Sequence, residues 1–353
     1  MASCGGSPAP AVCAGNKSVW GGEYVASNRK RLFVPTIMGA GGFEVLKTRE
    51  DVAVVPFPPM ISAPDFNALL RADGEVHGAI LGLTRFGDTE AKNAQGLQVV
   101  ARIGVGYDTV DVPALTRHKV PLMIAGTANS PSVAEQAMHF MFALAKRGAE
   151  LHAMVQANRW GDRMSALPID LIGKTLLIVG FGRIGTRVAK RTLAMEMNVL
   201  VYDPYVTPAA IRAAGCEPVT DLDAALPRAD FVTIHCPKTP ETTGMFNLAR
   251  LKRMKPTAYL VNTARGGIVD ETDLHAALTS GVIPAAGLDV LDREPPDPDN
   301  PLLKLNNVIT APHMAGVTRE SIDRMAVQAV RNALSVFDGA PIVENVVNPE
   351  VLG

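Results

Sequence analysis

The stretch LLIVGFGRIG, residues 176–185, decides how this chain is expected to fold. An apolar run leads into a G-x-G-x-x-G pattern, and a helical pattern follows at 188–193. The glycine pattern alone is weak, but strand, glycine loop and helix in this order are typical of a dinucleotide-binding unit. Gly180 is expected to permit the tight turn, Gly182 to let the backbone approach a pyrophosphate, and Gly185 to let helix and strand pack closely. The first N–H groups of the helix would then face the phosphates.

An acidic residue follows the next predicted strand, 199–202, where a ribose-binding group is expected. Asp203 comes 18 residues after Gly185, close to the roughly 20 residues of the dinucleotide-binding pattern. A carboxylate there accepts hydrogen bonds from the ribose hydroxyls and repels a 2′-phosphate, which favours NAD over NADP. The alternative is that Asp203 only begins a turn with Pro204.

Strands and helical patterns alternate along the whole chain outside its first 30 residues. The strands predicted before the long helix are Leu32–Val34, Val52–Val55, Gly78–Leu81, Leu97–Ile103 and Leu122–Ile124. About six more are predicted after it, at Thr175–Val179, Val199–Tyr202, Phe231–His235, Tyr259–Val261, Ala286–Asp289 and Val308–Thr310. This alternation predicts an α/β protein with two flavodoxin/Rossmann-like domains, the second a doubly wound parallel sheet, and a cleft between them.

Two helices and one loop are predicted from local signals. Ser132 is a plausible N-cap with Glu135 in capping-box spacing, and it begins a long apolar helix that we take as the entry to the second domain. The apolar period over Thr318–Phe337 predicts the last helix. Pro56–Pro59 is expected to mark a joint between elements.

Composition excludes several classes of function. The 353 residues include 34 Lys and Arg against 35 Asp and Glu, a net charge of −1 that offers no field for nucleic acid or an anionic membrane. No apolar run approaches the roughly 20 residues of a membrane span, and the N-terminus lacks the pattern of a signal peptide. The four cysteines show no C-x-x-C spacing, so a cytoplasmic location is expected. Residues 1–30 are expected to be an extension, in which Trp20 and Tyr24 could contact the globule or a partner.

Three polar residues come just after successive predicted strands of the second unit. They are Arg265, Glu294 and His313. Ligands of open α/β sheets bind beyond the carboxyl ends of the strands. Arg can hold a carboxylate with a two-pronged hydrogen bond, His can exchange a hydroxyl proton near neutral pH, and a Glu beside that His would orient it. Taken singly, each has a structural alternative: a helix cap for Arg265, a solvated loop acid for Glu294 and a surface histidine for His313. The acidic run 289–299 is expected to be a rigid loop, so no metal site is predicted.

The chain resembles the D-isomer-specific 2-hydroxyacid dehydrogenase family over residues 31 to 349. The motifs that carry the resemblance are IGVGYDTVD (103–111), ANSPSVAE (128–135), GFGRIG, VYDPY, HCPKTPETTGMFN, VNTARGGIVDE, GLDVLDREPP and APHMAG. The resemblance implies that Arg265 binds substrate, that Glu294 is the paired acid and that His313 is the acid/base. It implies that Val105 and Gly106 offer N–H groups to the substrate carboxylate. Around NAD the predicted residues are Gly180, Gly182, Arg183, Ile184, Gly185, Asp203, Cys236, Pro237, Thr263, Ala264, Asp289 and Gly316.

The resemblance also implies a domain plan and a homodimer. An N-terminal extension at 1–30 is followed by a discontinuous substrate domain, 31–128 and 318–353, around an NAD-binding domain at 129–317. The activity expected is NAD-dependent interconversion of a D-2-hydroxy acid and its 2-oxo acid. The alternative is an NAD-sensing, corepressor-like binding protein on the same fold; formate oxidation is a third option, for which no extra site residues are identified.

One departure from the family concerns the substrate. Phosphoglycerate dehydrogenases often carry an Arg directly after the strand that here ends at Leu81, whereas this chain has Gly82, Leu83 and Thr84 before Arg85. The sequence therefore leaves open which 2-hydroxy acid is the substrate and whether it is phosphorylated. The chain ends at residue 353, so the C-terminal regulatory domain of the longer phosphoglycerate enzymes is not expected either.

Overall fold

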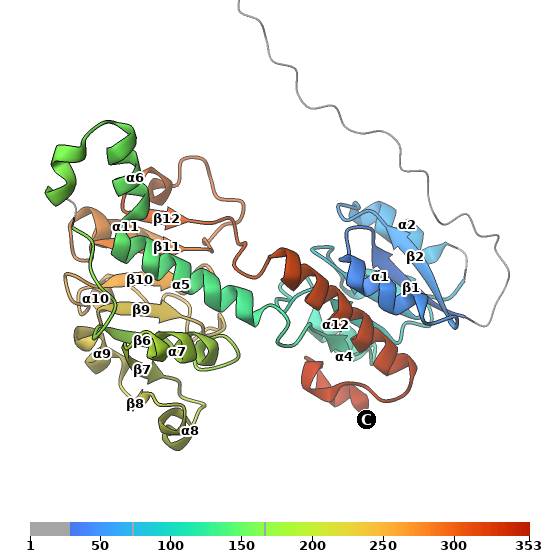
Figure 1. The fold of residues 1–353 in the computed structure, drawn as a ribbon. Coiled ribbons are helices and arrows are strands. Elements are labelled where there is room, and N and C mark those ends of the chain that lie inside the picture. The colour runs from blue at the N-terminus through green and yellow to red at the C-terminus, as the bar shows by residue number, and fades with distance from the viewer. Residues whose placement is uncertain (1–28, 73, 166) are drawn as a thin grey trace, which may run out of the picture.

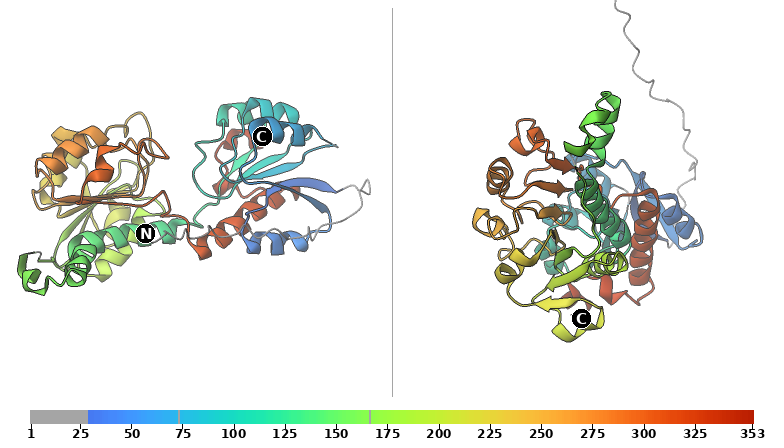
Figure 2. Two further views of the ribbon diagram at one scale, coloured as in Figure 1. Left: turned by 90° about the horizontal axis from the view of Figure 1, so that it is seen from above. Right: turned by 60° about the vertical axis from the view of Figure 1, so that its left-hand side comes forward.

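The computed structural model describes residues 29–72, 74–165 and 167–353 of the chain. The predictions about the N-terminal extension, including those on Trp20 and Tyr24, lie outside the described residues except at its end, where Lys30 already belongs to the first strand. Figures 1 and 2 show two α/β units side by side, with the chain passing between them once before α5 and once before α12. Among the described residues, no helix is both long and apolar enough to cross a membrane.

The first unit is a five-stranded, all-parallel sheet with the order β2-β1-β3-β4-β5. Its strands are β1 (Lys30–Pro35), β2 (Val52–Phe57), β3 (Gly78–Leu81), β4 (Val99–Arg102) and β5 (Leu122–Met123). Its helices are α1 (Ala40–Lys47), α2 (Ala63–Arg71), α3 (Asp88–Asn93), α4 (Val112–Arg117) and, from the end of the chain, α12 (Arg319–Phe337). Short 3-10 turns at Val343–Asn345 and Pro349–Leu352 follow α12. This strand order is that of flavodoxin-like sheets.

The second unit is a seven-stranded parallel sheet with the order β12-β11-β10-β9-β6-β7-β8. Its strands are β6 (Thr175–Val179), β7 (Asn198–Tyr202), β8 (Glu217–Val219), β9 (Phe231–Ile234), β10 (Tyr259–Asn262), β11 (Ala285–Leu288) and β12 (Val308–Thr310). Its helices are α5 (Ser130–Lys146), α6 (Gly148–Gln156), α7 (Gly185–Ala194), α8 (Pro208–Ala213), α9 (Leu222–Ala225), α10 (Leu248–Leu251) and α11 (Glu271–Thr279), with 3-10 turns at Trp160–Ser165, Leu226–Arg228 and Pro301–Lys304. The α/β class with two parallel Rossmann-like sheets is confirmed.

The strand β6 shows why the strands of this sheet are continuous apolar runs. Leu177 and Val179 belong to the apolar cluster on one face of the sheet, and Leu176 and Ile178 belong to the cluster on the other. All four side chains are almost fully buried. Helices cover both faces of a parallel sheet, so alternate residues on both sides must be apolar.

Four local predictions differ from the structure. Pro56 lies inside β2 rather than in a joint, and it fits there because β2 is an edge strand, where a missing N–H costs little. The predicted strand 97–103 shortens to β4 because the chain bends at Gly104, whose φ is +133°. The seven-stranded sheet of the described chain contains β8, a three-residue edge strand too short to show a period. Finally, α5 begins two residues before Ser132.

The start of α5 shows why the N-cap prediction was wrong. Asn129 occupies the N-cap position, and proline at residue 131 falls in the first turn, where its missing N–H is tolerated. Ser132 is buried, and its hydroxyl lies 3.3 Å from the Thr318 hydroxyl and accepts from Arg324 at 3.2 Å. The Ser132 hydroxyl therefore links the two segments at which the chain passes between units, rather than capping a helix.

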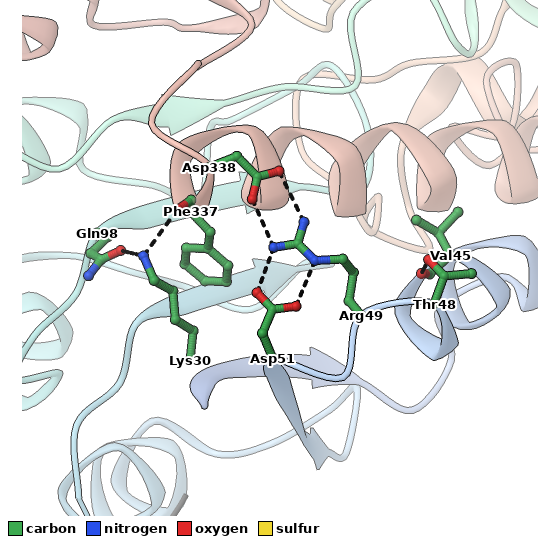
Figure 3. A network of polar contacts seen from close by, with 8 residues as sticks. All are labelled: Lys30, Val45, Thr48, Arg49, Asp51, Gln98, Phe337 and Asp338. Atoms are coloured by element: carbon green, nitrogen blue, oxygen red, sulfur yellow. Dashed lines mark hydrogen bonds and ion pairs between the residues drawn. The ribbon is translucent and has the colours of Figure 1, made fainter. Parts of the chain in front are cut away.

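The end of α12 is fixed to the first unit by a charged cluster, drawn in Figure 3. Arg49 donates to both carboxylate oxygens of Asp51, at 2.8 and 2.7 Å, and to both of Asp338, at 3.0 and 2.8 Å. Lys30 donates to Gln98 at 2.9 Å and to the carbonyl of Phe337 at 3.3 Å. The hydrogen bonds from Arg49 lower the pKa of Asp51 to about 2.

Replacing Arg49 with methionine is expected to lower the melting temperature near pH 7 by roughly 2 °C, because the gain from exposed pairs is small. A carboxyl whose pKa is depressed on folding stabilises the protein above its unfolded pKa, and this contribution disappears as pH falls from about 4 to about 2. The variant should therefore lose less stability than the parent over that interval, measured by thermal unfolding. Lys47→Met, which removes a separate surface pair with Glu44, is the matched control and should keep the parent's acid dependence.

Candidate functional site

The glycine loop lies where the strand order of the second sheet reverses. The strand β6 has β7 on one side and β9 on the other, so the segments that follow β6 and β9 separate at this point. Gly180 adopts a φ of +98°, and a Cβ added there would lie 2.6 Å from the backbone nitrogen of Cys236. Only glycine meets both conditions. The tight turn predicted for Gly180 is therefore a packing requirement of the chain.

The other two glycines of the loop differ in whether the packing of the chain requires them. A Cβ at Gly185 would collide with the carbonyl oxygen of Gly180, which enforces close contact between α7 and β6. A Cβ at Gly182 would meet no heavy atom within 4 Å, so the packing of the chain does not require glycine there. The backbone N–H groups of Gly182, Arg183 and Ile184 donate no hydrogen bond to the described residues. Unpaired N–H groups at the start of a helix fit an anionic group such as a pyrophosphate.

Asp203 follows β7 and faces the glycine loop. One carboxylate oxygen accepts from the Phe181 N–H at 2.7 Å, and the other accepts from the Tyr205 N–H at 2.8 Å. The residue thus begins the local turn and also fixes the glycine loop. Each oxygen keeps a lone pair for a further donor.

The side chain of Arg183 extends to the first unit instead of remaining at its own loop. It donates to the carbonyl of Gly126 at 3.0 Å and to that of Glu344 at 3.3 Å. Ile184 precedes α7 and packs against the apolar cluster around Leu176. Gly316 lies at the second passage between units, where an added Cβ would meet the amide nitrogen of Asn129 at 2.8 Å.

The segments after β9 and β10 carry Cys236, Pro237, Thr263 and Ala264, the predicted wall of the cofactor site. Burial raises the pKa of the Cys236 thiol to about 11, so it stays protonated. Burial also lowers the pKa of His235 to about 3; its ring nitrogens lie 3.0 Å from the Thr233 hydroxyl and 3.4 Å from that of Thr263. His235 is therefore a neutral structural residue. The carbonyl of Pro237 accepts from the Thr242 hydroxyl at 2.8 Å, which shapes the next turn.

Arg265 is presented by a turn that the side chain of Asn262 fixes. Asn262 accepts from the Ala264 N–H at 3.0 Å and donates to the carbonyl of Arg265 at 2.9 Å. A Cβ on Gly266 would collide with the carbonyl of Leu291, so this turn touches the loop that carries Glu294. Arg265 also donates to the Ala264 carbonyl at 2.8 Å, which limits its freedom.

His313 and Glu294 form a direct pair. The His313 Nδ1 lies 2.6 Å from Glu294 Oε2, and the other carboxylate oxygen accepts from the Leu291 N–H at 3.0 Å. The predicted pairing of this acid with this histidine is therefore present in the geometry. With Nδ1 engaged by the carboxylate, Nε2 is the ring nitrogen left to exchange a proton with another molecule.

Asp289 holds the His313 loop in an unusual conformation. His313 has a φ of +54°, in the left-handed region that favours glycine. The Asp289 carboxylate, only 1% exposed, accepts from the N–H groups of Met314 and Ala315 at 2.9 Å each. Burial raises the pKa of Asp289 against the lowering effect of those bonds. Both carboxylate oxygens of Asp289 thus accept hydrogen bonds from the loop that follows His313.

Residues of the first unit, in the loop after β4, lie against Arg265. A Cβ on Gly106 would lie 2.5 Å from an Nη of Arg265, and Arg265 Nε lies 3.5 Å from the Asp108 carboxylate. In the described chain neither Val105 nor Gly106 donates its N–H to a protein acceptor. Unpaired N–H groups and a guanidinium at one place can hold a small carboxylate.

Arg102, which was not singled out from the sequence, fixes the loop that carries Val105 and Gly106. Its side chain is buried, donating to the carbonyl of Gly106 at 3.0 Å and to that of Leu81 at 3.5 Å. Burial lowers the pKa of Arg102 to about 10, and Arg265 contributes repulsion. The signal available was an arginine ending an otherwise apolar strand.

Half of the chain matches the model of a known protein family. Residues 138–315, half of the chain, match the family model "D-isomer specific 2-hydroxyacid dehydrogenase, NAD binding domain". A D-3-phosphoglycerate dehydrogenase of Archaeoglobus fulgidus is 41% identical over 255 residues, 72% of this chain and 48% of that protein. The chain spans about half the length of the curated relatives it matches.

Solved structures extend the similarity to both units. The TT0316 protein of Thermus thermophilus has a TM-score of 0.77 and 32% identity, covering 90% of this chain and 99% of its own. A structure described as the pyruvate reductase of Chlamydomonas reinhardtii has a TM-score of 0.73 and 27% identity, covering 89% and 98%. With the family model matching the unit that carries the glycine loop, the turn of Arg265 and the His313–Glu294 pair, the chain belongs to the D-isomer-specific 2-hydroxyacid dehydrogenase family.

Proposed function

We propose that this protein is an NAD-dependent oxidoreductase that interconverts a D-2-hydroxy acid and its 2-oxo acid. The observation that carries the proposal is the 2.6 Å contact between His313 and Glu294. Both residues lie in the second unit together with Arg265, which contacts the Gly106 loop of the first unit. Curated relatives are named for phosphoglycerate and a structural neighbour for pyruvate. The chemistry they share is a carboxylate beside a carbon that changes between hydroxyl and carbonyl.

Each residue has a distinct part in this proposal. Arg265 and the N–H groups of Val105 and Gly106 hold the substrate carboxylate. In the reductive direction His313 donates the proton from Nε2 to the carbonyl oxygen, and in the oxidative direction it accepts the hydroxyl proton. Glu294 orients the ring through Nδ1, which leaves Nε2 toward the substrate. NAD, when bound, supplies or accepts the hydride.

The same residues assign a separate binding role to each domain. Residues 129–317 would bind NAD through the glycine loop, Asp203 and the wall formed at Cys236, Pro237, Thr263 and Ala264. Residues 31–128 and 318–353 would form the substrate domain. Asp289 and Gly316 would act at the edge of the cofactor site by shaping the His313 loop and the passage between units.

Asp203 is expected to select NAD over NADP. A 2′-phosphate beside this carboxylate would meet like-charge repulsion, whereas ribose hydroxyls can donate to it. In Asp203→Asn the ratio of kcat/KM with NADH to that with NADPH should fall by roughly tenfold, a change of about 1.4 kcal/mol. A parent enzyme whose kcat/KM with NADPH equals or exceeds that with NADH would refute the assignment. Asp221→Asn, a helix cap elsewhere in the unit, is the control.

A homodimer and a cytoplasmic location are part of the proposal. Large apolar side chains are exposed along the stretch of the second unit that runs from α5 to the start of β6: Phe142, Val155, Trp160, Met164, Leu167 and Ile172. Exposed apolar surface of this kind favours association, and a second copy of the chain is the partner proposed. Cys216 and Cys236 are free thiols, in keeping with a reducing compartment.

The test of the proposed function is turnover of NADH with a panel of 2-oxo acids: glyoxylate, pyruvate, hydroxypyruvate, phosphohydroxypyruvate and bulkier acids. Oxidation of NADH that depends on one of these acids supports the enzyme. Binding of NADH without turnover of any acid would favour the corepressor-like alternative instead.

A further inference from the structure

The loop after β3 has an inverted pattern of burial. Leu83 is 76% exposed, whereas Thr84 beside it is buried, and the Thr84 hydroxyl has no hydrogen-bond partner among the described residues. Exposing a leucine and burying an unpaired hydroxyl are both unfavourable. A loop that does both conflicts with the ordinary rules of folding, and such conflicts are expected at functional sites.

Exposed apolar side chains recur at the same edge of the first sheet. The strands are parallel, so the segments after β1 to β4 leave from one edge, and β3 and β4 are direct neighbours about 4.8 Å apart. Tyr107, after β4, is 41% exposed and follows Gly106, which contacts Arg265. From the second unit Met314, 47% exposed, follows His313. Tyr107 and Met314 thus follow directly in the chain the groups proposed to hold and protonate the substrate, and Leu83 follows β3, the strand that pairs with β4.

The loops after β1, β2 and β3 carry no cation before Arg85 that could hold a phosphate. The segments Thr36–Gly39, Pro58–Ser62 and Gly82–Thr84 contain no charged residue. Arg85 follows them, is exposed and forms no ion pair with the described residues. Asp108, 78% exposed, adds a negative charge beside Arg265. A phosphorylated side chain would need cations here and would meet this carboxylate.

We propose that Leu83, Tyr107 and Met314 line the subsite for the substrate's side chain, and that this subsite selects an apolar chain over a phosphorylated one. The inference rests on the proposed function. It names the substrate class as 2-oxo acids with a methyl or short alkyl group. Leu83 is the specificity-determining residue, since it is 76% exposed in the loop after β3, and β3 pairs with β4, whose own loop carries Tyr107.

The test compares three acids with NADH: glyoxylate, which has no side chain, 2-oxobutanoate and phosphohydroxypyruvate. We expect the parent to prefer 2-oxobutanoate to phosphohydroxypyruvate by at least roughly tenfold in kcat/KM. Leu83→Ala should lower kcat/KM for 2-oxobutanoate by roughly tenfold and leave glyoxylate nearly unchanged. Leu83→Arg should reverse the preference. Leu303→Ala, an exposed leucine of a 3-10 turn in the second unit, is the matched control and should change neither ratio.

Two results would overturn the subsite. One is a parent that prefers phosphohydroxypyruvate, with the preference removed by Arg85→Ala. The other is a Leu83→Ala enzyme that loses glyoxylate and 2-oxobutanoate activity alike. Either could occur while the parent enzyme still turns over glyoxylate, so the proposed function would stand. If the parent reduces no acid, calorimetric titration of the NAD-loaded protein decides: tighter binding of 2-oxobutanoate than of phosphohydroxypyruvate supports the subsite, and the opposite order refutes it.

Discussion

Replacing His313 with alanine is expected to lower the rate of 2-oxo acid reduction by roughly 10²- to 10⁴-fold at every pH, with NADH binding largely retained. The reason is that His313 pairs with Glu294 at 2.6 Å through one ring nitrogen and keeps the other available for proton transfer. The other close histidine–carboxylate pair of the described residues, His118 with Asp88 at 3.0 Å, joins α3 to the end of α4 in the first unit. The measurement is kcat/KM for reduction between about pH 5 and 10, an interval that brackets ordinary histidine titration, together with NADH affinity by fluorescence. His275→Ala, in α11, is the control and should keep the parent's rate.

Glu294→Gln gives the same pair a second, graded test. Glutamine keeps the approximate shape but removes the carboxylate, so the hydrogen bond at His313 Nδ1 is no longer charge-assisted and holds the ring less firmly. The kcat for 2-oxo acid reduction should therefore fall by roughly tenfold, a loss of about 1.4 kcal/mol, with NADH affinity retained. An unchanged kcat in Glu294→Gln, or substantial turnover by His313→Ala, would show that the pair is not the acid/base system.

Replacing Arg265 with lysine is expected to raise KM for the oxo acid and to lower kcat, for a combined loss of roughly 10- to 100-fold in kcat/KM. Lysine keeps the charge but not the planar, two-pronged donor, and hydrogen bonds to charged groups contribute about 1.5–3 kcal/mol. The backbone positions Arg265 closely, since Asn262 fixes its turn and Gly106 leaves room for its guanidinium.

The control for this prediction is Arg293→Lys, because Arg293 forms an exposed pair with Asp297 in the loop that also carries Glu294. That variant should behave as the parent. Unchanged kinetics in Arg265→Lys would remove Arg265 from the substrate site, whereas a loss confined to NADH affinity would move it to the cofactor.

The glycine loop was predictable because its requirements are local. The turn at Gly180 and the contact of Gly185 with β6 depend on residues close in sequence, apart from the contact between Gly180 and Cys236. The continuous apolar strands were visible for a similar reason: burial on both faces imposes an apolar residue at every position. By contrast, Ser132 was misassigned as a cap because its partners, Thr318 and Arg324, lie almost 200 residues away.

The alternation of strands and helices, the position of the dinucleotide loop and the residue types of the proposed site could all be predicted from the amino-acid sequence. Each depends on a short segment: the spacing of apolar residues, the spacing of the glycines, and the polar residues that follow a strand. The tertiary structure alone decided which of these residues meet. It brought Glu294 to His313 across 19 residues, placed Arg265 against Gly106 of the other unit, and directed Arg183 to carbonyls at the junction. It also showed the buried roles of Arg102 and Asp289 and the exposure of Leu83. Such contacts depend on how loops from separate strands converge at one sheet edge, and no local pattern encodes that convergence.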